Sequence, residues 1–243
     1  MKFMIIAIET SSTNFSISLL HEEHTINNIT VPFKNELSEI IVPTIKRFLK
    51  DNSIFFKDVS FIAVGCGPGS FTGIRSVVSV ALGIKISNNH IRSIGINSLA
   101  GLAISVLDEA KKLNIKYILS SIDSKRGDLF LQLFKLNCAK VETLPFDIVN
   151  DIETINIENL PEYISINKIT PKDILFVGYQ SKLAKNLVKD IKIAKKFNQK
   201  PNSLDVAKLA SIIIKNNVET NTPIFIFDKI KPIYARSAQI NLI

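Results

Sequence analysis

The chain has 243 residues, and 46% of them are hydrophobic, which is enough for a substantial core in one large or two modest domains. Its net charge of +8 favours polyanionic partners such as nucleic acid, and its two cysteines, Cys66 and Cys138, make neither a disulfide framework nor a four-cysteine zinc site. No apolar run approaches the roughly 20 residues of a membrane span, and Glu9 comes too soon for a signal peptide. We therefore expect a cytoplasmic protein.

The first 113 residues are expected to form an α/β domain in the order β-β-β-α-β-α-β-α. Three strands joined by tight turns come first, and such a meander is antiparallel. Pro43 lies inside the first helix and predicts either a kink or a later start there, and Ser98 is expected to cap the third helix. The expected strands are residues 3–9, 15–20, 25–33, 59–66 and 91–95, and the expected helices are residues 36–50, 71–87 and 98–113.

A similar order of elements begins again after residue 113. Both faces of the segment 128–136 are apolar, whereas residues 147–173 are poorly patterned, with at most one short helix. Ser203 is expected to cap the last helix, which we expect to pack back on the first domain. The chain is thus predicted to be α/β, with duplicated domains of mixed sheets at residues 1–113 and, as a smaller and eroded copy, at residues 114–243. The expected strands of this part are residues 117–123, 128–136, 138–144, 174–178 and 223–227, and the expected helices are residues 180–190 and 203–217.

The stretch Gly67–Arg75 and the helix that follows it organise the first domain. Its glycines mark a turn after a buried strand, and Ser70 or Thr72 is expected to cap the helix. One apolar stripe of this helix is expected to face the core. A second stripe is made of small residues, and a glycine inside a helix costs about 1 kcal/mol relative to alanine. The presence of glycine at position 83 therefore needs an explanation. Either the backbone of a partner approaches closely there, or the helix packs tightly within the same domain. The small stripe comprises Gly73, Ser76, Val80, Gly83 and Ser87.

Five motifs, taken in order, make the sequence resemble the TsaB (YeaZ) family. The most specific is Gly67–Arg75, which reads Gly-Pro-Gly-Ser-Phe-Thr-Gly-Ile-Arg. The resemblance covers essentially the whole chain. It implies duplicated actin/Hsp70/sugar-kinase-like domains, the ASKHA or ribonuclease H-like fold, which agrees with the element order above. The motifs are residues 6–11, 67–75, 95–99, 121–128 and 232–236.

The resemblance also implies a role in making N6-threonylcarbamoyladenosine at position 37 of tRNA. TsaB is a non-catalytic paralogue of the transfer subunit TsaD, pairs with it, and is joined by the ATPase TsaE. By resemblance we expect no catalytic residues, a heterodimer with TsaD, a homodimer when the chain is alone, and contacts with tRNA that are indirect or made through a basic surface. The expected partner interface lies on two helices and comprises Leu37, Ile41, Ile45, Gly73, Ser76, Val80, Gly83 and Ser87.

No metal is expected. The transfer subunit holds a metal with a His-x-x-x-His pair, in which both histidines share a helix face. At the corresponding position this chain reads Asn35-Glu36-Leu37-Ser38-Glu39. His21 and His24 flank a predicted turn, where solvated side chains are a more economical reading than a metal site. His90 follows a helix, where a cation suits the carboxyl end.

No cofactor is expected either, with weak nucleotide binding left open. The turn Glu9–Asn14 stands where ASKHA ATPases grip phosphate, but it has no glycine to let the backbone wrap an anion. We expect its hydroxyl groups to bond local backbone instead. The loop Gly67–Gly73 lacks the Gly-Lys-Ser/Thr ending of a P-loop. An active ASKHA ATPase or phosphotransferase is the alternative function. A peptidase with Ser70 as nucleophile is the poorest reading, because no positioned histidine and acid accompany it.

Arg75 and a series of lysines are the remaining candidate groups. Arg75 lies in the first turn of its helix, where the dipole disfavours a cation, so it predicts either an acidic partner or a solvated side chain. The lysines of the second domain form either a solvated face or a surface that faces tRNA. Motif residues with an expected structural role are Glu9, Thr10, Ser11, Gly67, Gly69, Ser70, Thr72 and Arg75. The lysines are Lys168, Lys172, Lys182, Lys185, Lys189, Lys192, Lys195, Lys196 and Lys200.

Overall fold

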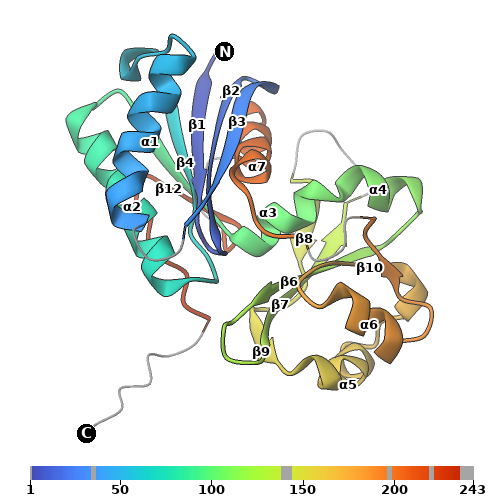
Figure 1. Ribbon diagram of the computed structural model, residues 1–243. Coiled ribbons are helices and arrows are strands. Elements are labelled where there is room, and N and C mark those ends of the chain that lie inside the picture. The colour runs from blue at the N-terminus through green and yellow to red at the C-terminus, as the bar shows by residue number, and fades with distance from the viewer. Residues whose placement is uncertain (1, 34–36, 138–143, 196–198, 219–221, 236–243) are drawn as a thin grey trace, which may run out of the picture.

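Two mixed six-stranded sheets form the framework of the chain in the computed structural model (Figure 1). The structure describes residues 2–33, 37–137, 144–195, 199–218 and 222–235. The first sheet has the order β12-β5-β4-β1-β2-β3, and the second has the order β11-β10-β6-β7-β8, with β9 also paired to β7. The strands are β1 (Met4–Glu9), β2 (Asn14–His21), β3 (His24–Pro32), β4 (Phe61–Gly65), β5 (Arg92–Ile96), β6 (Tyr117–Asp123), β7 (Leu129–Leu136), β8 (Phe146–Ile148), β9 (Glu153–Ile155), β10 (Ile174–Gly178), β11 (Lys192–Ile193) and β12 (Phe225–Phe227).

The same strand order occurs twice. In the first sheet β2 is antiparallel to β1, and β4 is parallel to it. In the second sheet β7 is antiparallel to β6, and β10 is parallel to it. The orders β3-β2-β1-β4-β5 and β8-β7-β6-β10-β11 therefore match strand for strand. This is the ribonuclease H-like order, so the predicted α/β fold with duplicated ASKHA units is confirmed.

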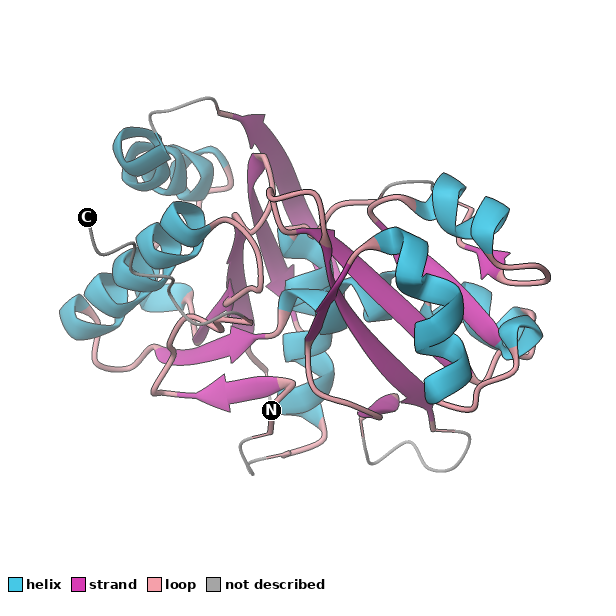
Figure 2. Cartoon of the chain, turned by 90° about the horizontal axis from the view of Figure 1, so that it is seen from below, coloured by secondary structure: helices cyan, strands magenta, loops and turns pink. Residues whose placement is uncertain are grey.

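Helices cover both sheets, and hydrophobic clusters fill the layers between them. α1 and α2 lie side by side on one face of the first sheet (Figure 1). α3 and α7 lie between the sheets, in a cluster that joins the two units. α5 and α6 cover the outer face of the second sheet, and seen from below helices lie in front of its strands (Figure 2). The helices are α1 (Leu37–Asp51), α2 (Phe71–Ser87), α3 (Ser98–Ser105), α4 (Leu107–Lys112), α5 (Leu160–Ile166), α6 (Ser181–Leu187) and α7 (Ser203–Lys215), with short 3-10 turns η1 (Phe56–Asp58), η2 (Ile157–Asn159) and η3 (Pro171–Asp173).

The predicted apolar faces are confirmed. Both faces of β7 are buried because its sheet is covered on both sides. Leu131 packs in the outer cluster with α5 and α6, whereas Phe134 packs in the cluster between the sheets. The helical stripes are buried as their spacing predicts. Two members of the predicted stripes, Ile40 and Leu82, are only half-buried. The buried members are Leu37, Ile41, Ile45 and Phe48 on α1, Ile74, Val77, Val78 and Ala81 on α2, and Val206, Leu209, Ala210 and Ile213 on α7.

Two predicted helix caps are wrong by one residue. Asn97 caps α3 and Asn202 caps α7, because in each case the amide oxygen accepts hydrogen bonds from N–H groups of the first turn. The serines that follow them, Ser98 and Ser203, use their hydroxyl groups for contacts with the first sheet instead. The predicted helix 98–113 is also divided, since α3 ends at Ser105 and α4 begins at Leu107.

The chain end belongs to the first unit. β12 pairs antiparallel with β5, although the sequence placed the segment 223–227 in the second domain. α7 packs against β1 and β2. At the other end, α1 runs through Pro43, so this proline does not mark its start. Within the described ranges, no helix is both long and apolar enough to cross a bilayer. Several expectations fall outside the described residues: most of the strand 138–144, Cys138, Asn35, Glu36, Lys196 and Arg236.

Candidate functional site

The carboxyl ends of the parallel strands β1, β4 and β5 meet around the buried side chain of Glu9. One carboxylate oxygen accepts a hydrogen bond from the backbone N–H of Ser11 at 2.5 Å, and the other accepts from the hydroxyl of Ser98 at 2.8 Å. A Cβ at Gly65 would lie 1.8 Å from this second oxygen, so the Glu9 side chain requires glycine at the end of β4. Burial raises the pKa of Glu9 because desolvation disfavours the charged form, and the hydrogen bonds from Ser11 and Ser98 oppose this shift.

Glu9→Gln is expected to gain stability over the wild type as the pH rises from 4.5, the ordinary pKa of the side chain. With a raised folded-state pKa, the native wild type holds the proton more tightly than the unfolded chain. Its stability therefore falls as the pH rises from 4.5 through the folded value. Glutamine keeps an acceptor for the N–H of Ser11 and has no charge to desolvate. Urea unfolding of both proteins between about pH 4 and pH 8 measures the difference. A stability difference that is constant across this range would contradict the shifted titration.

The first turn and the glycine-rich loop pack tightly against each other. The N–H of Ser70 donates to the carbonyl of Ser11 at 2.8 Å, and a Cβ at Gly69, whose φ is +150°, would lie 2.2 Å from the same oxygen. Ser70 Oγ accepts from the N–H of Gly73 at 3.3 Å, which confirms Ser70 as a cap of α2. Gly67 donates its N–H to a serine hydroxyl of α3 at 3.2 Å. These N–H groups are therefore used within the chain rather than directed at an anion.

The hydroxyl groups of the first turn do not behave as expected. Within the described part of the chain, the buried Thr10 Oγ1 has no hydrogen-bond partner. Thr13 Oγ1 accepts from the ammonium of Lys200 at 2.7 Å instead of bonding local backbone. The expectation is wrong because the Glu9 carboxylate and the glycine-rich loop already bond the backbone of the turn. Thr72, the other predicted cap, is exposed, and Ser70 fills that role.

Arg75 meets aromatic rings rather than an acid. Its guanidinium carbon lies 3.8 Å from the centroid of the Phe71 ring, and its Nε donates to the hydroxyl of Tyr234 at 2.9 Å. The two rings lie 5.5 Å apart, and each side chain is 51% exposed. Next to them, the N–H of Ile233 donates to the carbonyl of Cys66 at 2.8 Å. Arg75 is exposed, as its solvated alternative predicts, and it also joins Tyr234 to the first turn of α2; an acidic partner on another subunit stays a prediction.

Arg75→Ala is expected to lower the free energy of unfolding by about 1 kcal/mol, since exposed cation–π contacts contribute about 0.5–1 kcal/mol and one hydrogen bond is also lost. Arg75→Lys is expected to restore little of this, because an ammonium lacks the flat face that lies on Phe71. Urea unfolding measures both, with Tyr234→Phe as the control that removes only the hydrogen bond. If Arg75→Lys matched the wild type, the positive charge rather than the stack would carry the effect.

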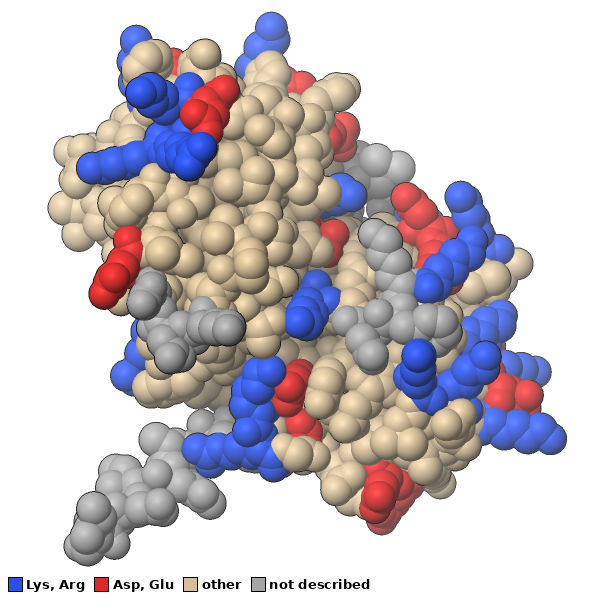
Figure 3. All heavy atoms as spheres, in the orientation of Figure 1, with Lys and Arg blue, Asp and Glu red and all other residues tan. Residues whose placement is uncertain are grey.

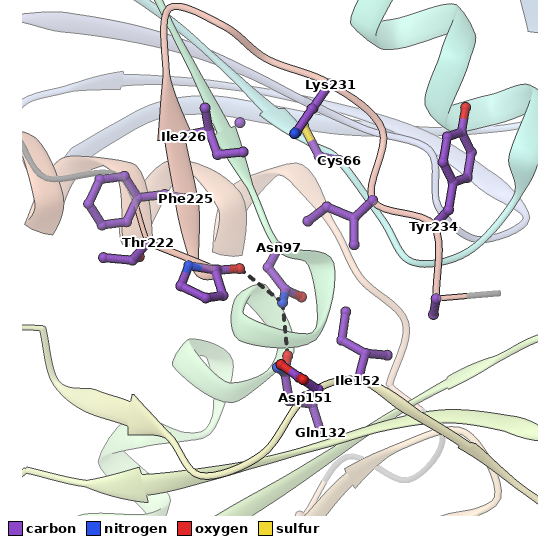
Figure 4. A pocket seen from close by; sticks show the side chains of 14 residues that line it. Cys66, Asn97, Gln132, Asp151, Ile152, Thr222, Phe225, Ile226, Lys231 and Tyr234 are labelled. Atoms are coloured by element: carbon purple, nitrogen blue, oxygen red, sulfur yellow. Dashed lines mark hydrogen bonds between the residues drawn. The ribbon is translucent and has the colours of Figure 1, made fainter. Parts of the chain in front are cut away.

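A cavity of about 310 Å³ lies between the two units and the chain end (Figure 4). Asn97 donates from Nδ2 to Oε1 of Gln132 at 2.8 Å and so connects the first unit to β7 of the second. Asp151 and Lys231 bring charges to a wall that is otherwise mostly apolar. Cys66 also lines the cavity, but burial raises the pKa of its thiol to about 12. The reactive thiolate is therefore scarce at neutral pH, and this cysteine is not an activated nucleophile.

The histidines are placed as structural residues. His21 ends β2 and His24 begins β3, and the two are paired across the turn that the sequence predicted. His90 Nε2 lies 3.1 Å from the carbonyl of Phe56. Over the ranges that the structure describes, no group of three His, Cys, Asp or Glu side chains gathers as metal ligands.

The exposed side of α2 carries most of the predicted small stripe. Gly83 is exposed, and a Cβ there would have no atom within 4 Å. Packing among the described residues therefore does not explain this glycine. One turn further on, the side chain of Ile86 is 77% exposed. We call this face the α2 surface, and it comprises Ser76, Ser79, Val80, Gly83, Ile86 and Ser87.

Four predicted interface residues lie in the core instead. Leu37, Ile41 and Ile45 are 5%, 0% and 2% exposed and belong to the cluster between α1, α2 and the first sheet. Gly73 is also buried, and a Cβ there would lie 2.5 Å from the carbonyl of Thr10. The prediction is wrong for these four because a helix packed on a sheet turns its most apolar face inward. The two glycines of the small stripe are thus explained differently: Gly73 is required by packing within the chain, whereas among the described residues Gly83 is not.

A comparison with protein-family models matches residues 30–225 to the family described as TsaD, tRNA N6-adenosine threonylcarbamoyltransferase. The chain belongs to this family. Several of its curated relatives carry the name TsaB, so the predicted TsaB/YeaZ relationship is confirmed.

The relatives differ in how much of each chain is aligned. The tRNA threonylcarbamoyladenosine biosynthesis protein TsaB of Bacillus subtilis is 28% identical over 188 residues, which cover 77% of this chain and 76% of the relative. The protein of the same name from Buchnera aphidicola of Schizaphis graminum is 32% identical over 130 residues, or 54% of this chain and 60% of the relative. The Escherichia coli protein is 27% identical over 126 residues, or 52% of each.

Solved structures support the fold. YeaZ from Pseudomonas aeruginosa superposes with a TM-score of 0.73 at 17% identity and covers 96% of this chain and 99% of its own. A second structure from that organism, an uncharacterized protein with similarity to peptidase YEAZ, also gives 0.73, at 18% identity, and covers 96% and 100%. The TsaB/YeaZ architecture therefore extends over nearly the whole chain.

Four of the five family motifs come together in space at one end of the first sheet, whereas the motif 121–128 belongs to the second unit. Glu9, the loop 67–75 and Ser98 are in direct contact, and Tyr234 of the last motif reaches Arg75. Sequence reasoning identified these TsaB/YeaZ motifs singly but missed their contacts. The sequence contains no feature that would predict the contact of Arg75 with Tyr234, because neither spacing nor charge pairs an arginine with a tyrosine in a distant segment.

Proposed function

We propose that the chain takes part in the synthesis of threonylcarbamoyladenosine in tRNA as a non-catalytic cytoplasmic subunit that pairs with TsaD and also with TsaE. The family match and the names of the curated relatives support the pathway. The observation that supports the subunit role is Gly83, an exposed glycine inside α2 that no contact with another described residue explains. A helix keeps such a residue at a cost of about 1 kcal/mol, which a close helix–helix contact with a partner would offset.

The α2 surface suits a partner helix. Small side chains let two helix axes approach to about 8 Å, the close end of the usual range. Ile86, which is 77% exposed, supplies apolar area for a partner to cover at one end of the surface. TsaD gives its name to the family that this chain matches, so a related helix of TsaD is the natural counterpart. In the absence of TsaD, a second copy of this chain would occupy the same surface and form a homodimer.

An active ASKHA ATPase or phosphotransferase is the alternative, and one observation favours it. A cavity of about 270 Å³ lies between Ser12 of the first turn and Asp123 and Lys125 at the end of β6, with Lys200 in its lining. Against it, the loop N–H groups are already bonded within the chain, and the Glu9 carboxylate is enclosed by its own partners. Calorimetric titration of the isolated chain with Mg-ATP tests the alternative, which needs tight binding.

Reconstitution tests the proposed function directly. TsaD, TsaE, tRNA and threonylcarbamoyl-adenylate are combined with and without this chain, and modified adenosine is measured. Modification is expected only when the chain is present. Full modification in its absence would overturn the subunit role, and turnover of any substrate by the chain alone would overturn its non-catalytic character.

A further inference from the structure

Charge is separated along the second unit. The described residues 144–167 hold five acids and no lysine or arginine, whereas the described residues 168–200 hold eight lysines and two acids. The strands β8 and β11 of these segments lie at opposite ends of the strand order of the second sheet, whereas α5 and α6 both cover its outer face. If the lysines were spread evenly over the second unit, the two segments would not differ in charge in this way. The acids are Asp147, Asp151, Glu153, Glu158 and Glu162, and the lysines are Lys168, Lys172, Lys182, Lys185, Lys189, Lys192, Lys195 and Lys200.

The fold adds further lysines to the basic edge from the end of α4. Lys192 Nζ donates to the carbonyl of Leu113 at 3.3 Å, which holds β11 against the residues that follow α4. Lys116 pairs with Asp173 at 2.9 Å and links the same region to η3. Figure 3 shows many blue side chains, with a few red ones among them, along the right-hand side of the second unit. We call this the β11-edge lysine surface, and it comprises Lys111, Lys112, Lys116, Lys172, Lys192 and Lys195.

Among the described residues, Lys116 is the only one of these six lysines that forms an ion pair. Asp173 is engaged by Lys116, and the carboxylate of Glu109 accepts from the backbone N–H of Lys195 at 3.2 Å. Within the described residues, no carboxylate pairs with the exposed ammonium groups of Lys112, Lys172 or Lys195. A set of unpaired ammonium groups on one edge attracts a polyanion and releases its counterions on binding.

We propose that the β11-edge lysine surface binds the phosphate backbone of RNA, and, resting on the proposed function, that this RNA is the tRNA being modified. Lysine ammonium groups contact phosphate as point charges, and such contacts position a nucleic acid without reading its sequence. None of the six residues that define the surface is aromatic, so we expect the contact to be made with the phosphate backbone rather than by stacking on bases. The chain would then hold the body of the tRNA while another subunit contacts the nucleotide to be modified.

The test compares two triple variants with equal loss of charge. Lys112→Gln, Lys172→Gln and Lys195→Gln together remove three exposed ammonium groups from the surface. The control is the triple variant K2Q/K50Q/K208Q, whose lysines are equally exposed but lie on the first unit. Binding of the isolated chain to unmodified tRNA is measured at several salt concentrations, and thermal unfolding confirms that both variants are folded.

The surface variant is expected to lower the slope of log K against log salt by about 2, because each phosphate contact contributes about 0.7–0.9. Its affinity at low salt is expected to fall by about tenfold or more, with the control close to wild type. An equal loss in both variants would show that net charge alone binds RNA and would overturn the proposal. So would an unchanged surface variant, or a surface that binds anionic lipid vesicles in preference to tRNA.

The failure of this proposal is distinguishable from failure of the proposed function. Binding is measured without TsaD, whereas the subunit role is measured by reconstitution. If the surface variant binds tRNA like wild type while the wild-type chain still stimulates modification, only the RNA surface is wrong. If the wild-type chain has no effect on modification, the subunit role is wrong whatever the salt slopes show.

Discussion

Gly65→Ala is expected to lower the free energy of unfolding by about 3–5 kcal/mol, the largest effect of any single methyl group considered for this chain. The added Cβ would lie 1.8 Å from a carboxylate oxygen of Glu9, and both groups are buried. Since neither can reach solvent, Glu9 must shift and give up hydrogen bonds from Ser11 and Ser98. Urea unfolding monitored by circular dichroism measures the loss.

Shortening the acid should rescue this variant. Glu9→Asp withdraws the carboxylate by one methylene, so the double variant E9D/G65A is expected to be less destabilised than the two single changes together, with a coupling of about 1–2 kcal/mol. The matched control is Gly101→Ala in α3, where the new Cβ would meet only Val206 Cγ2 at 3.8 Å. That change is expected to be neutral or stabilising by up to about 1 kcal/mol, because alanine favours a helix. Equal losses at Gly65 and Gly101 would contradict a specific clash with Glu9.

Most of the fold could be predicted from the sequence because strands and helices leave local patterns of apolar residues. The alternation of β7, with leucine on one face and phenylalanine on the other, shows directly that both faces are covered. The stripes of α1, α2 and α7 likewise identify their buried sides. Local patterns could not predict that a side chain at the start of a helix forms its hydrogen bond with a strand that is distant in the sequence. Ser98 and Ser203 resemble helix caps, yet their hydroxyl groups bond to Glu9 and Ser18, and the preceding asparagines cap the helices.

The candidate site was predictable only in part for the same reason. The periodicity of α2 separates an apolar stripe from a small one, but it does not say which small residues are covered by the chain itself. A side chain at Gly73 would clash with the carbonyl of Thr10, whereas one at Gly83 would contact no described atom. In the sequence, both glycines are simply members of the same stripe of small residues. On α1 the most apolar residues were assigned to a partner, although Leu37, Ile41 and Ile45 are the ones that the first sheet needs for its own core.

Gly83→Leu is expected to leave the fold intact and to abolish stable pairing with TsaD, and hence modification of tRNA. The monomer has room for the change, because a Cβ at this position has no atom within 4 Å, and leucine favours a helix over glycine by close to 1 kcal/mol. At a close helix–helix contact the same side chain would hold the axes apart. Overpacking of this kind costs about 1–3 kcal/mol or more, which corresponds to about 5- to 150-fold weaker binding or more.

Two control variants separate the surface from the side chain. Gly83→Ala adds only a methyl group and is expected to pair with TsaD nearly as well as wild type. Lys208→Leu places the same leucine on an exposed position of α7, away from the α2 surface, and is expected to have no effect on pairing. Co-purification with TsaD and analytical ultracentrifugation measure pairing, and thermal unfolding verifies the monomer. A Gly83→Leu chain that co-purifies with TsaD in equal amounts would show that the exposed glycine serves no contact with this partner, and the argument from an unexplained glycine to a partner helix would fail.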